Sequence, residues 1–95
     1  MLFDKPVKSG EVITVKLTSG EELIARFEKD ADKTLTISKV VVLAPGAKGI
    51  GMVPWLMSSE PKEVNLNKDC IFTYAVTQKE IADKYTEMTS SIQLV

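Results

Sequence analysis

The segment Val12–Val42 reads VITVKLTSGEELIARFEKDADKTLTISKVVV and holds three runs in which apolar and polar residues alternate. A period of two is typical of strands that bury one face. Ser19 and Gly20 separate the first run from the second, and the charged residues 29–33 separate the second from the third. Connections this short predict three consecutive antiparallel strands.

The strand pattern continues beyond this segment. Alternation gives way to continuous apolar residues at 40–43, which predicts that the third strand bends and carries a bulge. A fourth strand is expected at Ile50–Met57, where Pro54 cannot donate a ladder hydrogen bond and so favours an edge or a kink. A fifth strand is expected at Cys70–Val76.

A helical pattern follows the last strand. Thr77–Glu80 reads TQKE, which is typical of a capping box at a helix N-terminus. Helical spacing then places three apolar residues on one stripe: Ile81, Tyr85 and Met88. The chain of 95 residues is therefore expected to form one domain, with an N-terminal arm at 1–10, a β domain at 11–76 and a C-terminal helix and tail at 77–95.

Charge and composition exclude several classes of protein. Twelve Lys and Arg residues against thirteen Asp and Glu give a net charge of −1, which disfavours a non-specific coat of nucleic acid. A single cysteine, Cys70, forms no intrachain disulfide, which fits a reducing compartment. No run approaches the roughly 20 apolar residues of a membrane-spanning helix. We therefore expect a cytoplasmic protein without a membrane partner.

The sequence gives little support for catalysis. It contains no histidine, so nucleophilic Cys-His and Ser-His pairs are excluded. Asp30 and Asp32 share one loop but supply too few oxygen ligands for Ca²⁺. The glycines at 46, 49 and 51 lack the Gly-Lys-Ser/Thr of a phosphate loop. We expect no enzymatic activity, no catalytic residue, no metal, no cofactor and no small-molecule substrate.

Two short motifs run through the predicted strands. The first consists of Val15, Leu17, Gly20, Leu23, Ala25, Phe27, Asp30, Leu35 and Ile37. The second lies at Leu66–Ile71 and is followed by the strand residues FTY. In order and spacing they resemble the two motifs of the Sm and Sm-like (LSm) family. The chain is similar to diverged Sm-like proteins of marine phages (cyanophages), and for a phage-encoded chain the expected location is the host cytoplasm.

The resemblance implies a fold and an assembly. The expected fold is mainly β: a small, strongly bent, five-stranded antiparallel Sm-like (SH3-type) barrel with a C-terminal helix. Family members form homo-oligomeric rings in which the fourth strand of one subunit pairs with the fifth strand of the next. The subunit interface expected from this comprises Ile50, Met52, Val53, Trp55, Met57, Ile71, Phe72 and Tyr74. The alternative is that Trp55 and the methionines fill the core of their own domain.

The resemblance also implies a site for single-stranded RNA, between the loop joining strands two and three and the turn joining strands four and five. The residues at those positions are Asp30, Asp32, Lys33, Thr34, Asn67 and Lys68. Asp32 stands where the family has a stacking side chain, which predicts weakened RNA binding. The alternatives are that these are ordinary solvated turn residues, and that the ring is a homo-oligomeric scaffold or protein-interaction module without RNA binding.

Overall fold

The computed structural model describes residues 7–46, 49–56, 58–59 and 61–93, so most of the predicted N-terminal arm and Met57 lie outside the described residues. The elements are β1 (Val12–Leu17), β2 (Glu22–Asp30), β3 (Thr34–Gly46), β4 (Gly49–Pro54), β5 (Val64–Asn67), the 3-10 turn η1 (Lys68–Cys70), β6 (Ile71–Val76) and α1 (Lys79–Gln93). In this part of the chain no helix is long and apolar enough to cross a membrane.

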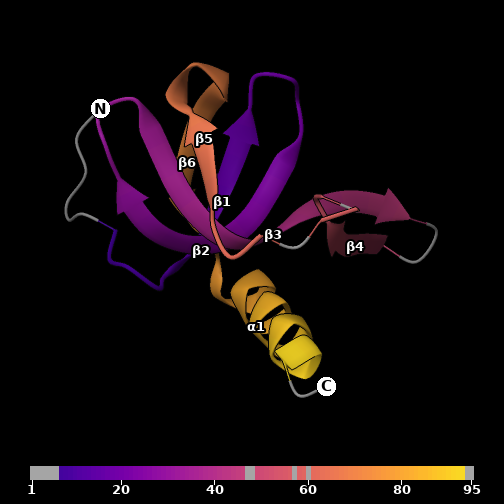
Figure 1. Ribbon diagram of the computed structural model, residues 1–95. Helices are drawn as coiled ribbons and strands as arrows, with labels where there is room; N and C mark the ends of the chain where they lie inside the picture. Colours follow the sequence, from indigo (N-terminus) through magenta and orange to yellow (C-terminus); the bar gives the residue numbers. More distant parts are fainter. Residues whose placement is uncertain (1–6, 47–48, 57, 60, 94–95) are drawn as a thin grey trace.

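The six strands form one antiparallel sheet, and the predicted mainly β fold with a C-terminal helix is confirmed (Figure 1). Neighbouring strands follow the order β4-β3-β2-β1-β6, and β5 pairs with β3. Among the described residues these pairs leave the sheet open and do not close it into a barrel. The strand predicted at Cys70–Val76 begins at Ile71, because Cys70 belongs to η1.

β4 and β5 lie along the same edge of β3, opposite β2. The second half of β3 pairs with β4, whereas Thr34–Ile37 pairs with β5. The strand predicted at Ile50–Met57 ends at Pro54, although the Trp55 amide still donates to the carbonyl oxygen of Val40 at 3.2 Å. The chain rejoins the edge of β3 only at Val64. The sheet therefore has six strands where the sequence predicts five.

A bulge bends β3 at Lys39. The register between β2 and β3 shifts between Ile24 and Arg26, so β3 carries one extra residue there. Lys39 has a φ of 51°, in the left-handed region that non-glycine residues seldom adopt. Beyond this point the end of β3 and β4 project from the sheet as a two-stranded arm (Figure 1). The predicted bend of the third strand thus begins at a bulge.

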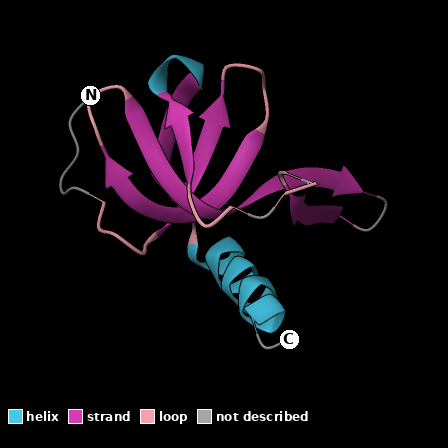
Figure 2. Cartoon of the chain, viewed as in Figure 1, coloured by secondary structure: helices cyan, strands magenta, loops and turns pink. Residues whose placement is uncertain are grey.

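The sheet buries side chains on both faces. The first core consists of Ile13, Val15, Leu17, Leu23, Ala25, Phe27, Leu35, Ile37 and Leu66. The second core consists of Val12, Ile24, Val41 and Tyr85, on the side where α1 lies against the sheet (Figure 2). Alternation in β2 predicts one buried face, but Ile24 on the other face is also fully buried because α1 covers it.

Tyr85 fixes α1 to the bend of β3. Its side chain is 0% exposed, and its hydroxyl donates a hydrogen bond of 2.6 Å to the carbonyl oxygen of Lys39. Ile81 and Met88, the other members of the predicted stripe, pack against the same core. The predicted apolar face of the helix is therefore confirmed.

The only arginine, Arg26, strengthens this contact from β2. Its guanidinium lies 5.7 Å from the centre of the Tyr85 ring, within cation–π range. One of its nitrogens donates to the carbonyl oxygen of Gly10 at 2.8 Å, and the other donates to the hydroxyl of Thr86 at 3.2 Å. Arg26 therefore joins the chain before β1, the sheet and the helix.

Thr77 does not cap α1 as the TQKE pattern predicts. The helix begins at Lys79, two residues later, and the Thr77 hydroxyl lies 2.8 Å from the hydroxyl of Thr14. The Thr77 amide donates to the carbonyl oxygen of Val12 at 3.0 Å. Thr77 is buried and connects the end of β6 to β1. The hydrogen bonds between these two strands therefore extend one residue beyond the strand that the sequence predicts.

We predict that Tyr85→Phe lowers the free energy of unfolding by about 1–2 kcal/mol, because the Lys39 carbonyl loses its buried donor. Tyr85→Ala should lower it by about 3–5 kcal/mol, because it also opens a cavity. Urea unfolding followed by Trp55 fluorescence measures both. The exposed Lys84→Ala serves as the control and should change stability by less than about 0.5 kcal/mol. Equal stability of Tyr85→Phe and the parent chain would contradict the role given to the hydroxyl.

Candidate functional site

The two loops singled out from the sequence meet at one end of the sheet. The Lys68 amide donates to the carbonyl oxygen of Lys33 at 2.9 Å, and Thr34 stands opposite Asn67 where β3 pairs with β5. The loop between β2 and β3 is closed by a bond from the Ala31 amide to the Thr34 carbonyl oxygen. The pairing of β3 with β5 therefore brings five of the six predicted residues into one cluster.

Asp30 lies at the centre of this cluster. Its carboxylate forms a salt bridge with the Lys68 ammonium and accepts a hydrogen bond of 2.9 Å from the Tyr74 hydroxyl. The Lys68 and Asp30 side chains are 35% and 41% exposed, so water screens the pair and its net contribution to stability is modest. Asp32, the sixth predicted residue, is exposed in the same loop and forms no ion pair within the described part of the chain.

The contacts set the protonation states of Asp30 and Tyr74. The hydrogen bond from Lys68 lowers the pKa of Asp30 below 3.8, against an opposing effect of burial, and the bond from Tyr74 lowers it further. The ionised Asp30 carboxylate therefore contributes to the free energy of unfolding above pH 3.8, and this contribution is lost as pH falls through the lowered pKa. Burial first, and then Asp30, raises the pKa of Tyr74 to about 12. At neutral pH, Tyr74 donates and Asp30 accepts.

Tyr74 belongs to the cluster although the sequence places it in a subunit interface. The rings of Tyr74 and Phe27 stack with centroids 6.4 Å apart and planes at 26°. Tyr74 stands opposite Val15, which places β6 beside the first core. The sequence carries no local signal for this contact, because it depends on the pairing of the first and last strands.

The remaining predicted interface residues lie on or beside the outermost strands, with mixed exposure. Phe72 on β6 is 75% exposed and Val53 on β4 is 42% exposed. Trp55 packs against the first core, as the alternative expects, and its indole nitrogen donates to Glu21 at 3.3 Å. The side chains of Ile50 and Met57 lie outside the described residues, and the remaining members, Met52 and Ile71, are partly buried.

Sequence reasoning missed two exposed apolar residues close to these. Leu56, just after β4, is 41% exposed, and Val76, at the end of β6, is 56% exposed. With Val53 and Phe72 they are the exposed large hydrophobic residues of the described chain. All four lie on or beside the two outermost strands. The apolar residues of those two segments were the sequence signal that could have identified Leu56 and Val76.

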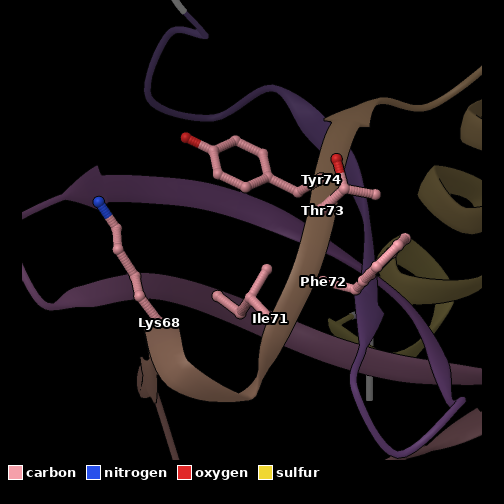
Figure 3. A pocket seen from close by; sticks show the side chains of 5 residues that line it. All are labelled: Lys68, Ile71, Phe72, Thr73 and Tyr74. Atoms are coloured by element: carbon pink, nitrogen blue, oxygen red, sulfur yellow. The ribbon is translucent and has the colours of Figure 1, made fainter. Parts of the chain in front are cut away.

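A shallow hollow of about 240 Å³ follows the outer side of β6. Its lining residues are Lys68, Ile71, Phe72, Thr73 and Tyr74. Figure 3 shows Tyr74, Ile71 and Lys68 on one side of the strand and Phe72 on the other. Because four consecutive residues of one strand line it, the hollow runs along the edge of β6 that pairs with no other described strand, where another strand could add.

The described residues contain no group of three or more His, Cys, Asp or Glu side chains that could hold a metal ion. What the cluster offers is two hydrogen-bond donors, the Lys68 ammonium and the Tyr74 hydroxyl, beside an apolar strand edge. Such donors bind anionic oxygen atoms. Comparison with known proteins gives no match to a family model and no match to a curated protein.

We predict that the alkaline titration of Tyr74 depends on Asp30. Tyr85→Phe leaves Tyr74 as the only tyrosine, and its phenol should ionise near pH 12 in the folded state. The neutral phenol of Tyr74 contributes to the free energy of unfolding below the ordinary tyrosine pKa of 10.0, and this contribution is lost as pH rises through about 12. Adding Asp30→Asn should lower this pKa only partly, because burial is the larger cause and remains.

Phenolate absorbance against pH measures this titration. Asp32→Asn in the same background removes the same charge from the same loop and should leave the Tyr74 titration almost unchanged. If Asp30→Asn and Asp32→Asn gave the same titration curve, the hydrogen bond between Tyr74 and Asp30 would not exist in solution.

Proposed function

We propose that the chain is an Sm-like protein that forms a homo-oligomeric ring and binds single-stranded RNA. The observation that carries the proposal is the contact between the loop before β3 and the turn after β5, which hydrogen-bond through Lys33 and Lys68. The resemblance to the Sm-like family predicts a site between these two segments. They are far apart in the sequence, and the antiparallel pairing of β3 with β5 brings them together.

The order of the strands supports an Sm-like (SH3-type) barrel within this proposal. β4 and β5 share one edge of β3, so they can be counted as two halves of a single interrupted fourth strand. On that count, five strands follow one another in the sheet. The three-residue turn η1 connects β5, which pairs with β3, directly to β6, which pairs with β1. On the same count, this turn joins the first and the last strand of the sheet.

The distribution of exposed apolar residues supports the ring. β6 pairs only with β1 and β4 pairs only with β3 among the described strands, so each has a free backbone edge. Val53 and Leu56 lie at the β4 edge, and Phe72 and Val76 lie on β6. Free edges with exposed apolar side chains favour strand addition, and pairing β4 of one copy with β6 of the next would cover both.

A second candidate function is a homo-oligomeric scaffold or protein-interaction module without RNA binding. The observation that favours it is the salt bridge between Lys68 and Asp30, which neutralises a lysine that the RNA-binding function needs. Both candidates predict the same assembly. Titration with RNA therefore distinguishes them.

For RNA binding, we predict that Lys33→Ala with Lys68→Ala weakens the binding of short labelled U-rich and A-rich strands by at least about tenfold at low salt, because two phosphate contacts are lost. Fluorescence anisotropy at several salt concentrations measures it. The matched control, Lys79→Ala with Lys84→Ala, removes two lysines from α1 and should leave affinity within about twofold. Saturable binding that is equal in the two double variants would move the site elsewhere, and no binding by the parent chain would favour the scaffold.

For assembly, we predict that Val53→Lys and Phe72→Lys each convert the oligomer to monomers, because a charge then lies in the strand-to-strand contact. Both side chains are exposed, so folding should change by less than about 0.5 kcal/mol. Size-exclusion chromatography with light scattering measures the mass. Ser90→Lys adds the same charge to an exposed position on α1 and should leave the oligomer intact. A parent chain that is monomeric at all concentrations would contradict the ring.

A further inference from the structure

Two donors from different elements converge on one carboxylate. The Lys68 ammonium comes from η1 and the Tyr74 hydroxyl comes from β6, and both contact Asp30 at the end of β2. In Figure 3 the Lys68 nitrogen and the Tyr74 hydroxyl lie on the same side of β6. A cation and a neutral donor arranged around an oxyanion form an anion site. In this structure a side chain of the same protein occupies that site.

The backbone positions of both donors are held without help from Asp30. Tyr74 is fixed by its stacking on Phe27 and by the pairing of β6 with Val15. The backbone of Lys68 is held by the bond from its amide to the Lys33 carbonyl oxygen, and its ammonium reaches Asp30 at the end of a flexible side chain. Asp30, by contrast, is the last residue of its strand, its side chain is 41% exposed, and it can turn toward water at little cost. An incoming anion would therefore meet the Tyr74 hydroxyl in place and the Lys68 ammonium within reach.

We infer that a phosphate group replaces the Asp30 carboxylate between Lys68 and Tyr74, so that Asp30 is an internal competitor of the ligand. This inference rests on the proposed function, and it assigns the phosphate of single-stranded RNA to these two side chains. It also reverses the role that the resemblance gives to Asp30, which is that of an RNA-binding residue. Tyr74 becomes a ligand-binding residue that the sequence does not predict.

The surroundings favour a phosphate that is part of a larger molecule. Ile71 lines the hollow on the same side of β6 as the two donors, and its apolar surface is of no use to a free phosphate ion. A ribose or a base attached to the phosphate would contact it.

Asp30→Asn tests the inference, with Asp32→Asn as its matched control. Both variants remove one negative charge from the same loop, but only Asp30 contacts Lys68 and Tyr74. Asp30→Asn should tighten RNA binding by roughly three- to tenfold, because Lys68 is released from its salt bridge. The slope of log affinity against log salt concentration should steepen by about one, because one more lysine then contacts a phosphate. Asp32→Asn should change the affinity by less than about twofold. Adding Tyr74→Phe to Asp30→Asn should remove part of the gain.

A titration with inorganic phosphate tests the inference without RNA. In Asp30→Asn, NMR signals of Lys68 and Tyr74 should shift saturably with millimolar phosphate, and in the parent chain they should shift much less. The Asp30→Asn variant should bind RNA more tightly than it binds free phosphate, because RNA also contacts the hollow. If Asp30→Asn is not folded by circular dichroism, Asp30→Ser takes its place with the same expected results.

The outcomes separate the two proposals. If the parent chain binds RNA but Asp30→Asn binds it no better than Asp32→Asn does, the inference is overturned and the RNA function stands. If no variant binds RNA but phosphate shifts Lys68 and Tyr74 in Asp30→Asn, the anion site stands and the RNA function fails. If neither RNA nor phosphate acts through these residues, the inference is overturned.

Discussion

The bend of β3 at Lys39 is the constraint on which the rest of the structure depends. One extra residue with a positive φ turns the strand, so that its first half pairs with β5 while its second half pairs with β4. The Tyr85 hydroxyl binds the carbonyl oxygen at this residue, and the ring fills the second core. The helix thus stabilises a backbone conformation that costs free energy, and it covers the face of β2 that would otherwise expose Ile24.

The candidate site is a consequence of that geometry. Pairing of β5 with the start of β3 places Lys68 beside the loop that follows β2, and pairing of β6 with β1 places Tyr74 above Phe27. Asp30 then has a cation and a hydroxyl within reach, although both are about forty residues away in the sequence. The lowered pKa of Asp30 and the raised pKa of Tyr74 follow from this meeting and from burial.

Local patterns predicted the local structure, and contacts between distant segments decided the rest. Alternation located β1 to β3 and helical spacing located the stripe around Tyr85, because side-chain direction repeats along each element. The break after Pro54 was foreseen as an edge or a kink, but the return of the chain to the edge of β3 at Val64 depends on pairing between distant segments. The loops of the site were predicted through family resemblance, whereas Tyr74 was missed because strand pairing brought it there.

The position of Arg26 has a consequence for recognition. The only arginine of the chain contacts Gly10, Thr86 and the ring of Tyr85, so it serves the attachment of the helix. A guanidinium makes planar, forked contacts to phosphates, which an ammonium group does not make. The positive charge that this domain offers to an anionic strand would therefore come from the compact ammonium groups of lysines. Contacts made through lysines follow the phosphates of a backbone and carry no sequence information themselves.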